Sequence, residues 1–242
     1  MRFLFRANWV VRWPAFEGVF GEGLLLEPKS KVLARVVALP DADQTPEMLA
    51  GLDAHLPPDA QFARRLAENG CQVLVPVLIN RQDAWSGNRT LKRFTNQPHR
   101  EWIYRQAYEM GRHIIGYEIQ KVLAAVDWFE QQNTNAAARQ PIGVFGYAEG
   151  GLIALYAAAL DSRITAAAVS GYFSSRQNLW SEPIYHNVFG LLHEFGDAEI
   201  DDEDGFYYRF SDEEFVQIPA EIADCKTMKF YRRVGARTAT HI

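Results

Sequence analysis

Residues 146–151, Gly-Tyr-Ala-Glu-Gly-Gly, have the residue types and the spacing of a turn that could carry chemistry. They follow a short apolar run and precede an apolar helical pattern. Small residues stand two positions before and two positions after Ala148. That spacing is typical of a nucleophile elbow, a strained strand-to-helix turn that presents its central residue at the edge of a sheet. The spacing therefore predicts that Ala148 lies at such a turn.

The alanine at the centre of this turn excludes acyl-enzyme chemistry there, because a methyl group has neither a lone pair nor a proton to exchange. Glu149 would be a carboxylate nucleophile only in a register that puts Tyr147 where a small residue is needed. We instead expect Glu149 to donate its backbone N–H to an oxyanion, together with an N–H from the loop after the first core strand. The alternative is a glycine-rich turn that only packs a helix onto a sheet. The predicted oxyanion pocket consists of Asp41, Ala42, Tyr147, Glu149 and Gly150.

A polar loop at residues 80–100 is long enough to indicate a functional role. Arg89 and His99 lie in it, among further cations and amides. These two residues favour a positively charged mouth for a carboxylate or sugar ligand, with surface solubility as the alternative.

The remaining histidines do not form a recognisable metal motif. His186 and His193 are seven residues apart and could share one helical face. A zinc site would need a third ligand, and no H-E-x-x-H motif occurs, so we expect no metal. His113 is interpreted as a packed or capping residue. The glycines form neither a dinucleotide-binding fingerprint nor a P-loop, so we expect no cofactor either.

The elements that would position these residues alternate between strand and helix. Strands are predicted at residues 32–39, 71–79, 141–146 and 165–170. Helices are predicted at residues 60–68, 101–132 (bent or split at Gly111 and Gly116) and 150–160. This alternation implies parallel crossovers and an α/β fold with a doubly wound, mostly parallel sheet. In such sheets ligands bind beyond the carboxyl ends of the strands, where the turn and the polar loop are expected.

Composition narrows the classes of partner. The chain has 242 residues and a net charge of −5, which excludes a whole-molecule basic field for nucleic acid. Its longest nearly apolar run, residues 150–160, is too short to cross a bilayer, and no secretory signal is recognised. We therefore expect no membrane partner and a cytoplasmic location. The sequence leaves the oligomeric state open.

The C-terminal segment has a charge pattern of its own. Acidic residues dominate from residue 197, and only basic charges occur from residue 226 onward. We interpret residues 201–242 as a segment separate from the domain of residues 1–200. Its two halves either attract one another as a solvated tail or bind a partner.

The run at residues 141–156 looks like the elbow region of α/β-hydrolases. More closely, the chain resembles bacterial acetyl xylan esterase-like and dienelactone hydrolase-like proteins over about residues 10–200. The matching stretches are Val-Arg-Trp-Pro at 11–14, Gly-Glu-Gly-Leu-Leu-Leu-Glu-Pro at 21–28, Val-Ala-Leu-Pro-Asp-Ala-Asp at 37–43, Thr-Asn-Gln-Pro-His-Arg-Glu-Trp at 95–102 and Ser-Glu-Pro-Ile-Tyr at 181–185. The resemblance implies a carboxylic-ester hydrolase ancestry, with serine or cysteine at the elbow centre, followed along the chain by an acid and a histidine.

The chain departs from that family pattern in two places. Ala148 stands at the nucleophile position, and residues 201–242 do not look like the family's continuation, so the fold is expected to be incomplete at its C-terminus. Asp224 and His241 are the candidates for the acid and the histidine. Two functions stay open. The first is an esterase-type hydrolase, weak or inactive in this chain, with a small-molecule ester or a carbohydrate-derived compound as its ligand. The second is a non-catalytic α/β-hydrolase-fold module that binds a ligand or a protein.

Overall fold

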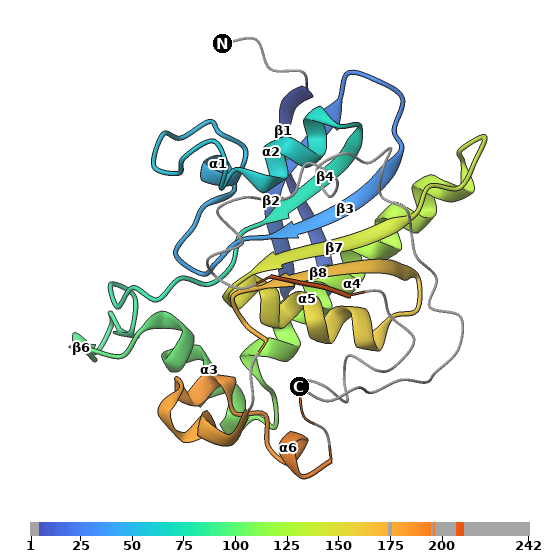
Figure 1. Ribbon diagram of the computed structural model, residues 1–242. Helices are drawn as coiled ribbons and strands as arrows, with labels where there is room; N and C mark the ends of the chain where they lie inside the picture. The colour runs from blue at the N-terminus through green and yellow to red at the C-terminus, as the bar shows by residue number, and fades with distance from the viewer. Residues whose placement is uncertain (1–4, 174–175, 195, 197–206, 211–242) are drawn as a thin grey trace.

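The predicted parallel strands form the centre of a larger mixed sheet. A computed structural model describes residues 5–173, 176–194, 196 and 207–210. Within these residues the main sheet has seven strands in the order β1-β2-β4-β3-β7-β8-β9 (Figure 1). Their bounds are Phe5–Phe16, Val19–Pro28, Cys71–Pro76, Ala34–Leu39, Ile142–Tyr147, Ile164–Ser170 and Tyr207–Phe210, in that spatial order. The pairs from β4 to β9 are parallel, which confirms the predicted α/β class.

The central strands β3 and β4 are buried and mostly apolar, with Arg35 and Gln72 as their buried polar residues. Every residue of β3 and of β4 is buried, as expected for parallel strands that are covered on both sides. The first thirty residues, to which the sequence analysis assigned no element, add the antiparallel hairpin β1–β2. Its second strand pairs with β4, also antiparallel, so the sheet is mixed at this edge.

Helices cover both faces of the sheet, and the sheet separates two clusters of buried side chains in the described part of the chain. The helices are α1 (Pro46–Leu49), α2 (Phe62–Glu68), α3 (His99–Glu109), α4 (Ile114–Thr134), α5 (Glu149–Leu160) and α6 (Leu191–Glu194). Short 3₁₀ helices span Arg176–Ser181 and Ile184–His186. Residues of α4 and α5 pack with one cluster, and residues of α1 and α2 pack with the other.

The long helix predicted at residues 101–132 is two helices, α3 and α4. Gly111 lies between them with φ +67°, a left-handed conformation that glycine adopts without steric cost. His113 then caps α4, because its Nδ1 accepts the backbone N–H of Ile115 at 3.1 Å. The capping role predicted for His113 is therefore confirmed.

The polar loop contains a small hairpin, β5 (Gly87–Asn88) and β6 (Arg93–Phe94), which Figure 1 shows projecting away from the main sheet. At the edge of the main sheet, β9, which lies beyond residue 200, pairs in parallel with β8. The other residues of segment 201–242 lie outside the described part. None of the described helices is both long and apolar enough to span a membrane.

Candidate active site

The strand-to-helix turn expected at Ala148 is present between β7 and α5. Ala148 has φ +49° and ψ −111°, and its N–H donates to the carbonyl oxygen of Ser170 at 2.8 Å. A Cβ added at Gly146 would overlap the carbonyl oxygen of Gly150, and one added at Gly150 would overlap that of Leu39. The two glycines are therefore required by close backbone contacts on either side of a strained residue.

The side chain of Glu149, next to Ala148, is fully buried and surrounded by positive groups. Its Oε1 accepts a hydrogen bond from Arg100 at 2.8 Å, and its Oε2 accepts one from Arg81 at 3.1 Å. His186 Nε2 lies 3.1–3.2 Å from both carboxylate oxygens. Burial opposes ionisation, but the His186 hydrogen bond and the charges of Arg100, His186 and Arg81 outweigh it and lower the pKa of Glu149.

Asp41 links the end of β3 to this turn. Its carboxylate accepts two hydrogen bonds from Arg81, at 2.7 and 2.8 Å, and a third from the backbone N–H of Glu149 at 3.2 Å. Burial raises the pKa of Asp41, but these bonds and the Arg81 charge lower it further than burial raises it. The N–H of Asp41 donates to Gln44 at 3.2 Å. The N–H expected to bind an oxyanion at Glu149 thus already donates to a carboxylate of the protein.

A second buried ion pair anchors Glu149 to the helices. Arg100, from α3, donates to both carboxylate oxygens of Glu118 in α4, at 2.8 and 2.9 Å, and to the carbonyl oxygen of Ile79 at 2.9 Å. The side chains of Arg100 and Glu118 are fully buried. The Arg100 guanidinium also lies 5.0 Å from the centre of the Tyr185 ring.

These charged side chains are connected to one another, and Glu182 joins them through its contact with His186. We call this group the charged network; its members are Asp41, Arg81, Arg100, Glu118, Glu149, Glu182 and His186.

His186 enters the charged network from the 3₁₀ helix Ile184–His186. Its Nδ1 lies 2.9 Å from Glu182 Oε2, and its Nε2 faces Glu149, so a carboxylate meets each ring nitrogen. The sequence analysis considered this histidine only together with His193. That residue instead lies on the surface, beside Glu194. The four-residue spacing between Glu182 and His186 is the signal that was available and was not used.

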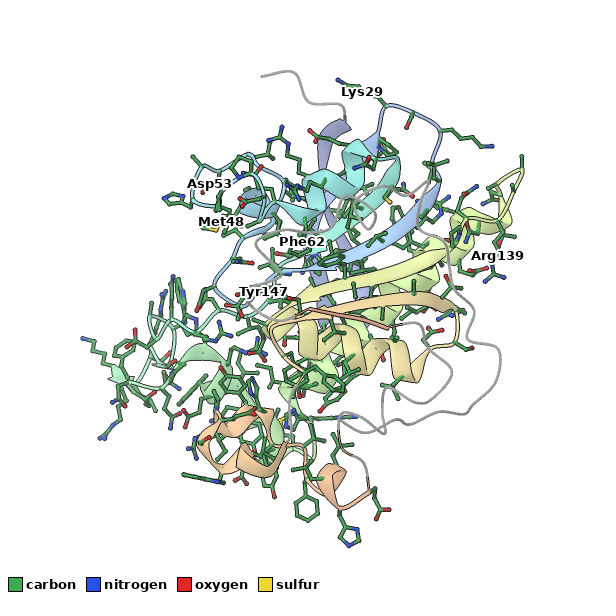
Figure 2. All side chains as sticks on the ribbon, in the orientation of Figure 1. Lys29, Met48, Asp53, Phe62, Arg139 and Tyr147 are labelled. Atoms are coloured by element: carbon green, nitrogen blue, oxygen red, sulfur yellow. The ribbon has the colours of Figure 1, made fainter. Side chains whose placement is uncertain are left out.

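The predicted site residues His99, Arg89 and Tyr147 do not join the charged network. His99 is buried and holds the polar loop in place: its Nδ1 lies 2.7 Å from Asn80 Oδ1, and its Nε2 accepts the N–H of Trp85 at 2.7 Å. Arg89 lies on the exposed hairpin, with its guanidinium 4.0 Å from the Trp85 ring centre. Tyr147 ends β7 at the carboxyl edge of the sheet (Figure 2) and packs against the cluster on the α1–α2 face.

The two triad candidates from the C-terminal segment, Asp224 and His241, lie outside the described residues. Within the residues that are described, no group of three or more histidine, cysteine, aspartate or glutamate side chains could hold a metal ion.

The mostly parallel sheet and the strained turn between β7 and α5 define a fold of the α/β-hydrolase type. The model of the dienelactone hydrolase family matches residues 48–192, which is more than half of the chain, and the chain therefore belongs to that family. No curated protein matches it.

A comparison with solved structures supports the fold through a match with a TM-score above 0.5. A candidate acetyl xylan esterase from Bacteroides fragilis is similar with a TM-score of 0.64 and 16% identity, over 88% of this chain and 61% of that one. This chain thus covers less than two thirds of that protein's length. A dienelactone hydrolase from Anabaena variabilis is also similar, with a TM-score of 0.49 and 16% identity, over 93% of this chain and 96% of that one.

Proposed function

We propose that this chain is an esterase-type hydrolase-family protein that does not form an acyl-enzyme. The observation that carries the proposal is Ala148 itself, at the φ +49° turn between β7 and α5. This is the position from which an elbow nucleophile would attack, and alanine offers no attacking atom. The family relationship makes a small-molecule ester or a carbohydrate-derived compound the expected ligand class, whereas the missing nucleophile argues for binding without efficient turnover.

The charged network supports the same conclusion from the groups that would assist a nucleophile. A base must accept a proton through a free ring nitrogen, but both nitrogens of His186 face carboxylates. An oxyanion needs a free N–H at the turn, but the N–H of Glu149 donates to Asp41. In this arrangement the protein's own ion pairs occupy the groups that a substrate would need.

An acyl-ester assay tests the proposal. The full chain is incubated with p-nitrophenyl acetate and, separately, with a fluorophosphonate that labels activated serines. A family member with serine at the elbow is the positive control. We expect no stoichiometric labelling and no saturable turnover above the buffer rate. Saturable turnover that the fluorophosphonate abolishes would show that an activated hydroxyl exists elsewhere in the chain, and the proposal would be wrong.

An alternative is favoured by one specific feature, the contact between Glu182 and His186 at 2.9 Å. A carboxylate that orients a histidine is part of the Ser-His-Asp and Ser-His-Glu triads. If Glu149 were displaced, His186 could activate water directly, and the chain would be a slow hydrolase without a covalent intermediate. Turnover that resists fluorophosphonate but disappears in His186→Ala would identify this function.

A further inference from the structure

A cavity of about 1040 Å³ lies at the junction of α3 and α4, outside the charged network. Its volume is at the upper end of the range of about 300–1,000 Å³ typical of ligand pockets. Figure 1 shows that α3 and the segment after β8 lie side by side. The residues that line the cavity come from this segment, from the end of α3 through to the start of α4, and from β1. The residues that bear on its chemistry are Phe16, Tyr108, Arg112, Gly116, Tyr117 and Phe189.

The walls of the cavity offer flat aromatic surface that the protein itself does not cover. Phe16 and Tyr117 stack with their ring centres 5.5 Å apart and their planes at 26°. Tyr108 is 54% exposed and Phe189 is 89% exposed. Large exposed rings gathered around one hollow indicate a binding surface, because isolated globular proteins rarely leave such patches uncovered. A planar ring is the shape that stacks best on these walls.

The charge of the cavity is positive. Arg112 lines it, and within the described residues this guanidinium has neither an ion pair nor a hydrogen bond. No carboxylate is found among the lining residues that the structure describes. An unpaired guanidinium beside aromatic rings favours a planar anion, which it can bind through two parallel hydrogen bonds.

The wall between the cavity and the charged network is held by a neutral histidine. His113 Nδ1 accepts the N–H of Ile115, so its Nε2 carries the proton and donates to the carbonyl oxygen of Asn187 at 3.3 Å. Burial and the positive charges of Arg100 and His186 lower the pKa of His113, although the bond to Asn187 opposes this. The cavity wall is therefore fixed at neutral pH without adding a charge of its own.

We propose that this cavity binds a small planar carboxylate, with the ring of the ligand against Phe16, Tyr108 or Tyr117 and its carboxylate on Arg112. Ala148 is not among the residues that line this cavity, so the proposal does not depend on whether the turn at Ala148 performs any chemistry. Ester turnover tests the proposed function and ligand binding at this cavity tests the present proposal, so one can be wrong while the other holds.

The test uses 2-naphthoate as the probe and 2-naphthol as its uncharged counterpart, titrated into the full chain by isothermal calorimetry. Gly116→Leu is designed to fill the cavity, because a Cβ added at Gly116 meets no atom within 4 Å. Leucine also favours a helix more than glycine does, so this variant should keep its thermal midpoint. Arg112→Gln removes the charge. Arg139→Gln, at an exposed arginine beyond the other end of α4 (Figure 2), is the matched control.

We expect the parent chain to bind 2-naphthoate saturably and to bind 2-naphthol at least tenfold more weakly. Arg112→Gln should bind 2-naphthoate at least tenfold more weakly than the parent does. A folded Gly116→Leu should not bind it. Arg139→Gln should bind as the parent does. The assignment is overturned if 2-naphthoate does not bind saturably, or if it binds all the variants equally. A parent chain that sediments as a dimer and becomes monomeric in Gly116→Leu would also overturn it, because a second copy would then cover this face.

Discussion

Arg100 is the residue on which the buried part of the charged network most depends, and its replacement by methionine should be strongly destabilising. The guanidinium donates to Glu118, to Glu149 and to the Ile79 carbonyl. After Arg100→Met, Glu149 keeps its contacts with Arg81 and His186. Glu118 keeps only the N–H of Ile79, at 3.2 Å, among the partners identified for it. The cost therefore falls on a fully buried carboxylate that has lost its counter-charge.

The expected loss in the free energy of unfolding is about 3–5 kcal/mol, the range found when one partner of a buried ion pair is removed. Because a whole domain is stabilised by only about 5–15 kcal/mol, this loss is a large fraction of the total. Equilibrium urea unfolding measures it from the midpoint and the slope of the transition.

Arg105→Met is the matched control, because Arg105 lies on the same helix and forms an i,i+4 pair with Glu101 at 2.6 Å. That pair is partly exposed, with the arginine side chain at 47%, so its loss should cost less than about 1 kcal/mol. The double variant Arg100→Met/Glu118→Leu should recover part of the loss, because it removes the uncompensated charge. A loss below about 1 kcal/mol for Arg100→Met, or no recovery in the double variant, would refute the reasoning.

Three further outcomes are expected. Gly150→Ala should lower stability by about 3 kcal/mol or more, since its Cβ would overlap the Leu39 carbonyl; an unchanged thermal midpoint would contradict this. The pKa values of Asp41 and Glu149 are lower in the folded than in the unfolded state, so both stabilise the fold above about pH 4, and this stability is lost as the pH falls through the folded-state values. The urea concentration at the unfolding midpoint should therefore decrease as the pH is lowered from about 6 to about 3. A midpoint that does not change with pH would contradict this. Ala148→Ser should give at most trace turnover of p-nitrophenyl acetate, because the nearby histidine is held between two carboxylates; robust, fluorophosphonate-sensitive turnover would contradict it.

Periodicity was sufficient to predict the core of the fold. The runs that became β3, β4, β7 and β8 are short, apolar and separated by helical patterns, which leaves few alternatives to a parallel sheet. The β1–β2 hairpin is not predicted from the sequence. In the structure its cross-strand pairs run from Phe5↔Pro28 to Phe16↔Val19. Arg6 and Arg12 interrupt the apolar residues of the first strand, so no strand is predicted there from hydrophobic pattern alone. The break between α3 and α4 was signalled by Gly111, but only the structure places it at a left-handed residue.

The turn at Ala148 was predictable because it is local, whereas the charged network was not. Glu149 and Asp41 are 108 residues apart, and Arg100 and Glu149 are 49 apart. In a single sequence Asp41 and Arg100 are indistinguishable from surface charges. Glu118 and Glu149 differ, because Glu118 falls among the apolar positions of a helical pattern and Glu149 opens an apolar helical stretch. A carboxylate on the buried face of a helix must be paired, and this is the signal from which a buried ion pair could have been inferred.

The position of the charged network has a consequence for the evolution of activity at this site. The network joins the loop after β3, the loop after β4, the helices α3 and α4, and the first residue of α5, all at the carboxyl edge of the sheet. In a buried ion-pair network of this kind each charge needs a counter-charge, because an uncompensated buried charge carries its full desolvation cost. Glu149 is the member that contacts His186 and both arginines. We infer that a hydroxyl at position 148 is not sufficient for catalysis. His186, the histidine that contacts Glu149 in the described residues, has its Nε2 bound by that carboxylate. Freeing it would require a second change that leaves Arg81 and Arg100 with another counter-charge.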